Sequence, residues 1–141
     1  MQEGPRNFMD NINVLVFVES RYKANRKRIT SAIKSLLKEQ GVTGAMEVSV
    51  AIVGDRKMRE LNKKYRNKEG TTNVLSFPLS EGDAQVLPPT EGKEFLRLGD
   101  IVISFPQVIK DASEEEVLVD DKIDELVQHG LLHLLGIHHE E

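Results

Sequence analysis

All four histidines of the 141-residue chain lie in its final segment, HGLLHLLGIHHEE. His129 and His133 are four residues apart, so on a helix their imidazoles lie on one face, one turn apart. Gly136 lets the chain turn back after this helix, and His139 can then provide a third ligand. This spacing is typical of a catalytic metal site with an open fourth position. The sequence therefore predicts one divalent transition metal per chain, with Zn²⁺ as the default for neutral imidazoles.

The residue after the first histidine limits the reaction that such a metal could support. In metalloproteases with the pattern HExxHxxGxxH, the glutamate at this place is the general base. Here the place is taken by Gly130. The spacing thus favours hydrolysis, while the missing glutamate argues against proteolysis. A glycine inside a helix also indicates the close approach of a neighbouring element.

The charge is distributed unevenly along the chain. Residues 1–70 hold 15 Lys and Arg against 8 Asp and Glu, whereas residues 71–141 hold 4 against 15. A basic half predicts a surface for an anionic partner, and solvated helix faces are the alternative. The basic residues that could form such a surface lie on two predicted helices and are Arg26, Lys27, Arg28, Lys63 and Lys64.

The composition favours a cytoplasmic protein. Cysteine is absent, which excludes disulfides and a disulfide-linked partner. The first residues lack the basic and apolar pattern of a signal peptide. The longest apolar run, residues 14–18, is too short to cross a bilayer, so no membrane partner is expected.

Hydrophobic periodicity predicts alternating strands and helices. The expected strands are residues 12–18, 48–52, 73–79 and 98–103. The expected helices are residues 23–40, a helix capped by Asp55, a short helix starting near Phe105 with Pro106 in its first turn, and residues 121–135. Two intervening segments are expected to be irregular: the polar loop 80–94 and the acidic connection 114–116.

This order predicts a single α+β domain. Strands joined through helices tend to be parallel, whereas the loop at 80–94 would join an antiparallel pair. We therefore expect a mixed four-stranded sheet packed with about four helices, with the three-histidine metal site at the end of the last helix. Residues 1–10 are expected to form a loose N-terminal arm, and residues 11–141 the metallohydrolase domain.

Three segments resemble one known family. HGLLHLLGIHH is similar to the HGxLHLxGYDH signature of the YbeY family. The segment LNKKYRNKEGTTNVLSFPL, residues 61–79, resembles that family's LNxxYRxKxxPTDVLSFPL, and LGDIVIS at 98–104 resembles the strand that follows. The resemblance extends from about Ile12 to His139.

The resemblance implies a zinc-dependent, single-strand-specific endoribonuclease that matures the 3′ end of 16S rRNA and acts in quality control of the small ribosomal subunit. It implies that His129, His133 and His139 bind the metal and that Arg66 serves substrate binding or catalysis. The residues agree, because a guanidinium can grip a phosphate at two points and stabilise charge that develops on it. For Arg66 the alternative is a solvated helix end.

Two departures from the family pattern affect the expected site. His138 stands where the family has Asp, so either a carboxylate that supports the ligands is missing or a fourth imidazole competes for the metal. The family's Pro-Thr-Asp is replaced by residues 71–73, Thr-Thr-Asn, which exchanges an acid for an amide.

The sequence leaves several points open. The general base could be Glu140, Asp100 or a hydroxide on the metal itself. A second hypothesis is a non-catalytic assembly factor that binds the small ribosomal subunit through the basic helices and uses the metal only as a structural element. A metallopeptidase is a third hypothesis, opposed by Gly130.

Overall fold

A computed structural model describes residues 11–79 and 96–137. The elements in chain order are β1 (Ile12–Val18), α1 (Arg26–Glu39), β2 (Met46–Val53), α2 (Asp55–Arg66), β3 (Val74–Pro78), β4 (Leu96–Ser104), α3 (Phe105–Glu115) and α4 (Val119–Leu134). This is the predicted order of strands and helices. The predicted N-terminal arm and the loop at 80–94 lie outside the described residues. Within the described part, no helix is both long and apolar enough to pass through a membrane.

The four strands form one mixed sheet in the order β1-β2-β4-β3. β1 and β4 run parallel to β2, and β3 runs antiparallel to β4. The predicted mixed four-stranded sheet of an α+β domain is therefore confirmed. β3 is an edge strand of this sheet.

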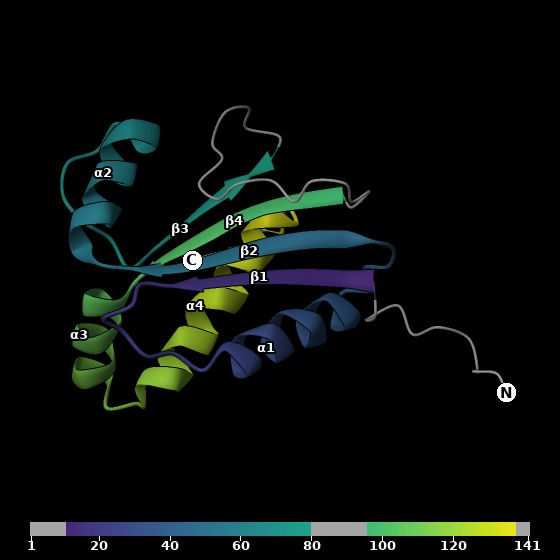
Figure 1. Cartoon of the computed structure of the whole chain (residues 1–141), viewed down its shortest axis with the longest axis horizontal. Coiled ribbons are helices and arrows are strands. Elements are labelled where there is room, and N and C mark those ends of the chain that lie inside the picture. The colour runs from purple at the N-terminus through teal and green to yellow at the C-terminus, as the bar shows by residue number, and fades with distance from the viewer. Residues whose placement is uncertain (1–10, 80–95, 138–141) are drawn as a thin grey trace, which may run out of the picture.

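Helices cover both faces of the sheet (Figure 1). α1 and α4 pack on one face, where alternate residues of β2 such as Val48 and Val50 meet the buried stripe of α4. α2 lies over the other face, and its Met58 and Leu61 form a smaller core with Phe77 of β3. Each helix thus buries one apolar stripe, as its periodicity predicts. The layers place α2 and α4 on opposite sides of the same edge strand.

The predicted acidic connection at 114–116 was wrong. α3 continues to Glu115, and only Glu116 leaves the helical conformation, with φ +60°. The helix begins as expected, because Ser104 caps it through a hydrogen bond from the Gln107 amide and Pro106 occupies its first turn. It runs on because glutamate is a good helix former and its charge remains exposed to water.

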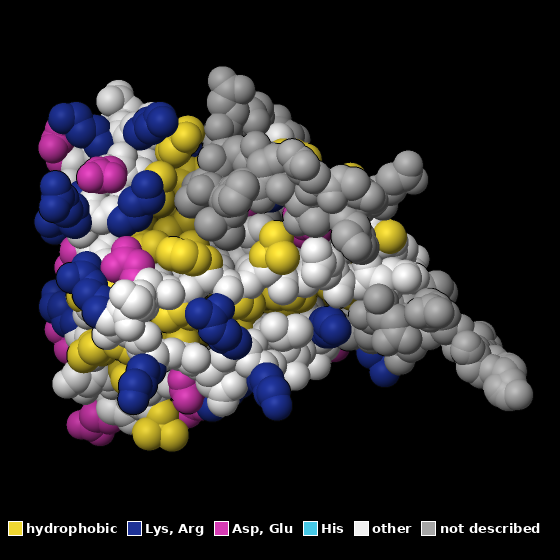
Figure 2. Space-filling model, in the orientation of Figure 1, with side chains coloured by type: hydrophobic (Ala, Val, Ile, Leu, Met, Phe, Trp, Pro, Cys, Tyr) yellow, Lys and Arg dark blue, Asp and Glu magenta, His cyan; other side chains and the backbone are white. Residues whose placement is uncertain are grey.

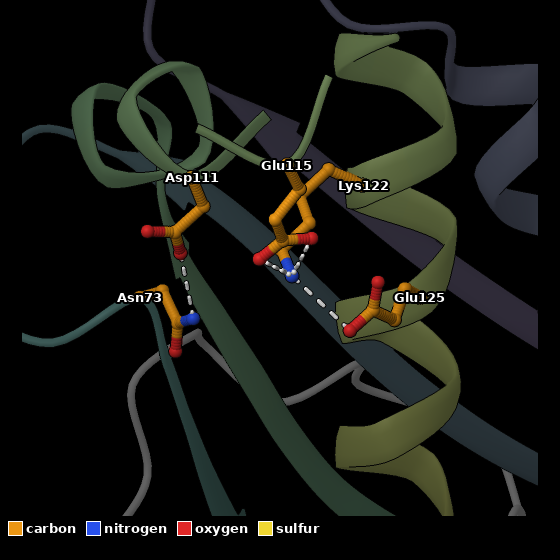
Figure 3. A network of polar contacts seen from close by, with 5 residues as sticks. All are labelled: Asn73, Asp111, Glu115, Lys122 and Glu125. Carbon is orange, nitrogen blue, oxygen red and sulfur yellow. Dashed lines mark hydrogen bonds and ion pairs between the residues drawn. The ribbon is translucent and has the colours of Figure 1, made fainter. Parts of the chain in front are cut away.

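Polar contacts fasten α3 to its neighbours (Figure 3). The buried amine of Lys122 on α4 donates to Glu115 on α3 at 3.0 Å and to Glu125 at 3.1 Å. Burial lowers the pKa of Lys122, but hydrogen bonds and charge from the two carboxylates raise that pKa above its ordinary value overall. Asn73, just before β3, donates from Nδ2 to Oδ2 of Asp111 at 2.9 Å. α3 is therefore tied to both α4 and the start of β3.

Asp55, which was predicted to cap this helix, is instead the first residue of α2 after the N-cap Gly54, and it ties together three segments. Its carboxylate accepts hydrogen bonds from Ser104 Oγ at 2.7 Å and from Thr71 Oγ1 at 3.0 Å, and further bonds from the Gln107 amide. Burial raises the pKa of Asp55, but these bonds and the charge of Arg59 lower that pKa below its ordinary value overall. The loop that follows α2 is thereby fixed where it enters β3.

Candidate functional site

The two described histidines lie on the last turns of α4. His129 and His133 both line a hollow of about 220 Å³, whose other lining residues belong to α2, β3 and α4: Arg66, Val74, Leu75, Ser76 and Gly130. The buried stripe of the helix points elsewhere, into the core. The two imidazoles thus lie on one face of α4, as their spacing predicts.

Gly130 lies at the closest approach between α4 and the sheet. A Cβ atom at this position would lie 2.9 Å from Cγ2 of Ile101 on β4, closer than such contacts occur. The glycine therefore lets the helix sit directly on the strand, as the sequence indicated. It also means that a glutamate cannot replace it unless the helix or the Ile101 side chain shifts.

α4 ends as predicted. Gly136 adopts φ +79°, and the amide of Ile137 donates to the carbonyl of Leu132 at 2.9 Å, a C-terminal motif that favours glycine. The chain turns here, and His138, His139 and Glu140 lie beyond the described residues. Within residues 11–79 and 96–137, no three side chains of His, Cys, Asp or Glu gather as a metal site. The structure thus brings two of the three predicted ligands together.

Arg66 is held against the edge of the sheet. It is the last residue of α2, which ends because Asn67 adopts the left-handed conformation, with φ 56°. Its Nη2 donates to the carbonyl oxygen of Ser76 at 2.6 Å, and its guanidinium carbon lies 5.3 Å from the centre of the Phe77 ring. The half-buried side chain is therefore fixed over β3, unlike that of a solvated helix end.

Ser76 is a residue of the hollow that the sequence did not single out. Its Oγ is hydrogen-bonded to Nδ1 of His133, and the residue is 9% exposed. The signal in the sequence was a lone polar residue inside the apolar strand VLSFP. Most hydroxyls buried in a strand have a hydrogen-bond partner, so such a serine indicates a polar neighbour on the packed element.

The predicted basic residues divide between two places. Lys63 and Lys64 are exposed on α2, over which Figure 2 shows Lys and Arg side chains gathering. On α1, Arg28 instead pairs with Asp121 and with Asp124, the latter at 2.7 Å. Hydrogen bonds to Asp121 and Asp124 raise the pKa of Arg28 above its ordinary value.

The α1 residues are consequently not brought to the hollow. Arg26 donates to the carbonyl of Val16, and Lys27 is exposed on the same helix. α1 packs beside α4 and β1, whereas the hollow lies on the side of α4 that faces β3. Of the five basic residues predicted for an anionic partner, the structure places Lys63 and Lys64 on the same helix as Arg66.

Comparison with known proteins gives a consistent family. The family model described as "Endoribonuclease YbeY" matches residues 15–141. The chain is 40% identical over 120 residues to the Endoribonuclease YbeY of Anaeromyxobacter sp. (strain Fw109-5), covering 85% of this chain and 57% of that relative. It is 35% identical over 122 residues to that of Syntrophus aciditrophicus, covering 86% and 72%, and 36% identical over 129 residues to that of Sulfurihydrogenibium sp., covering 92% and 77%.

A solved structure has a similar fold. The solution structure of a Thermotoga maritima protein superposes with a TM-score of 0.55 at 24% sequence identity, covering 92% of this chain and 75% of that one. At this identity the likeness concerns the fold alone. It agrees with the mixed sheet and the two helical layers described above.

Proposed function

The chain belongs to the YbeY endoribonuclease family, and we propose that it hydrolyses phosphodiester bonds of single-stranded RNA during rRNA maturation, with a divalent metal bound beside Arg66. The observation that carries this proposal is the hollow at the β3 edge. It unites a guanidinium from α2 with two imidazoles from α4, and no acidic residue is among its described lining.

The described residues fit a divalent metal. Two imidazoles one helical turn apart can bind one ion from the same side, and His139 would be the third ligand. The hydrogen bond between Ser76 Oγ and Nδ1 of His133 is the kind of contact that orients a metal-binding imidazole and leaves Nε2 as the ligand atom. Zinc is the proposed ion, since neutral imidazoles suit it.

The residues divide the work as follows. A divalent ion bound here would supply Lewis-acid chemistry, which activates water and polarises a phosphoryl oxygen. Arg66, which is fixed over β3, grips the scissile phosphate and neutralises charge that develops on its oxygens. In this proposal one phosphate of an unpaired strand lies between the guanidinium and the imidazoles that line the hollow.

The basic surface of α2 extends the site toward a longer RNA. Lys63 and Lys64 are exposed on the helix that ends in Arg66, so their ammonium groups can contact phosphates next to the scissile one. The resemblance to the family implies the 3′ end of 16S rRNA in the small ribosomal subunit, and we propose this substrate and partner for the chain. In this proposal the chain works in the cytoplasm.

Two other functions compete with this one. A metallopeptidase is disfavoured because the position of its general base is Gly130, where a side chain would collide with Ile101. A non-catalytic assembly factor would use the same basic helix and the same metal, so only a measurement of cleavage separates it from a nuclease.

The deciding experiment is a single-turnover cleavage assay. A labelled single-stranded RNA carrying a small-subunit rRNA 3′ sequence is incubated with excess protein, with EDTA, and with EDTA followed by Zn²⁺, Mn²⁺, Co²⁺ or Ni²⁺. We expect cleavage that EDTA abolishes and one of the ions restores, and no cleavage of the matching duplex. Tight RNA binding without cleavage under every ion would leave the assembly factor as the function.

A further inference from the structure

We propose that Ser76 is a positioning residue that holds the two halves of the site in register: its side chain orients His133, and its main chain holds Arg66. This inference rests on the proposed function, in which His133 binds a metal and Arg66 binds a phosphate. The family motifs do not assign Ser76 to metal binding or to phosphate binding. The inference predicts that its side chain affects the first and its main chain the second.

The side chain of Ser76 sets the orientation of the imidazole. Its Oγ is hydrogen-bonded to Nδ1 of His133. If His133 binds a metal through Nε2, then Nδ1 carries the proton and donates it to the serine oxygen. The hydrogen bond therefore selects the tautomer and the ring rotation that a metal needs, a role often filled by a carboxylate or a carbonyl.

The main chain of Ser76 has a different partner. Its carbonyl oxygen accepts the hydrogen bond from Nη2 of Arg66 at 2.6 Å. The guanidinium also lies over the ring of the next residue, Phe77. One residue therefore links a side chain from α2 with a side chain from α4, and both hydrogen bonds are partly buried at the same point of β3.

The packing of β3, β4 and α4 holds Ser76 in place. It is the third of the five residues of β3, and it lies opposite Ile101 of β4 in the antiparallel register. Ile101 in turn packs where Gly130 allows α4 to approach the sheet. The separation between β3 and α4 is thus fixed by close packing rather than by the hydrogen bond, so removal of the hydroxyl releases the imidazole without moving the helix.

The test separates the two links by substitution. Ser76→Ala removes the hydroxyl but keeps the carbonyl that Arg66 uses. We expect its affinity for Zn²⁺ and Co²⁺, measured by competition with a chromophoric chelator, to fall roughly tenfold to hundredfold, the cost of losing a group that orients a ligand. The visible spectrum of the Co²⁺ form should change as well. The affinity of the metal-free protein for single-stranded RNA should stay the same.

Two control variants isolate the hydroxyl. Ser49→Ala removes a fully buried serine hydroxyl of β2 that has no hydrogen-bond partner among the described residues, and it should bind metal as the unsubstituted protein does. Ser76→Thr keeps an Oγ and should restore most of the metal affinity. Thermal unfolding of each metal-free variant shows whether the fold is retained.

The outcomes distinguish this inference from the proposed function. If folded Ser76→Ala binds Co²⁺ with the affinity and spectrum of the unsubstituted protein, Ser76 does not position His133. A folded Ser76→Thr that is as weak as Ser76→Ala would also overturn the role of the hydroxyl. If instead the unsubstituted protein binds neither ion, and His133→Ala changes nothing, then the proposed metal site itself has failed.

Discussion

The two flanks of α4 differ in how their polar residues are used. On the flank toward α1, Asp121 and Asp124 close onto Arg28 beside a hollow of about 300 Å³. On the flank toward β3, His129 and His133 line a hollow of about 220 Å³ together with Arg66. One flank matches opposite charges within the protein. The other gathers groups that bind anions or metals.

This difference separates polar residues that pair with one another within the protein from polar residues that line the candidate site. An arginine between two carboxylates is already satisfied, and exposed ion pairs of this kind add little to stability. Two imidazoles and a guanidinium do not attract one another, and Ser76 holds two of these groups, His133 and Arg66, at the hollow. In the proposed function, a bound cation would suit the imidazoles and a bound phosphate would suit the guanidinium.

The largest effect is expected from the histidines of the β3 flank. Purified protein should contain about one equivalent of metal, and His133→Ala should lose both that metal and detectable RNA cleavage, because the remaining imidazoles form a weak site. Elemental analysis after dialysis measures the first loss. Asp124→Asn, on the other flank, is the matched control and should keep its metal. Unchanged metal content in His133→Ala would show that the flank is misassigned.

The next effect concerns the two arginines. Arg66→Ala should keep its metal but lose roughly two to three orders of magnitude in single-turnover rate, the scale for one preorganised donor to a charged transition state. Arg28→Ala should cleave at the unsubstituted rate, because that side chain serves the α1 flank. A rate that saturating RNA restores in Arg66→Ala would mean that Arg66 only anchors the ground state.

The sequence predicted most of the fold because its periodicities are strong. The strand expected at residues 48–52 is β2 (Met46–Val53), although all of its residues are buried rather than alternate ones, and the helix expected at 121–135 is α4 (Val119–Leu134). The prediction for the acidic stretch 114–116 was wrong at its first two residues, because glutamate is compatible with an exposed helix.

The site was only partly accessible from the sequence. His129 and His133 are neighbours on one helix, so their spacing predicted their common face. The link between Ser76 and His133 joins residues 57 positions apart and depends on how α4 crosses an edge strand. The sequence pattern does not predict how α4 crosses the strand. The serine in VLSFP and the helical glycine at 130 each indicate only that another element packs closely there.

A smaller effect, on the free energy of unfolding, is expected when Gly130 is replaced by alanine. Alanine favours helices more than glycine does, so a purely local view predicts that Gly130→Ala stabilises the protein. We expect the opposite, a loss of about 1–3 kcal/mol in the free energy of unfolding, because the new methyl group would meet Ile101 at 2.9 Å. Urea unfolding measures it, with the exposed Gln128→Ala on the other flank as control. A stabilised Gly130→Ala would show that α4 is free to move.

The smallest effect concerns Asn73, where the family pattern has an acid. Its amide donates to Asp111 at 2.9 Å, a bond that an ionised aspartate cannot make (Figure 3). Asn73→Asp should therefore lower the free energy of unfolding at neutral pH by about 1 kcal/mol. The charge of Asp111 would raise the pKa of the new carboxyl group. The loss is thus present above that pKa and disappears as the pH falls through it, since the protonated acid can again donate.

The pH dependence and a reciprocal exchange test this account of Asn73. Urea unfolding at neutral pH and near pH 4, about the ordinary pKa of an aspartate, should show the deficit of Asn73→Asp shrinking in acid. The double variant Asn73→Asp with Asp111→Asn reverses donor and acceptor and should regain the lost stability at neutral pH, a coupling between contacting residues. If the double variant is no more stable than Asn73→Asp alone, the bond between α3 and the start of β3 contributes nothing. The hydrogen bond between Asn73 and Asp111 would then add as little to stability as an exposed ion pair does.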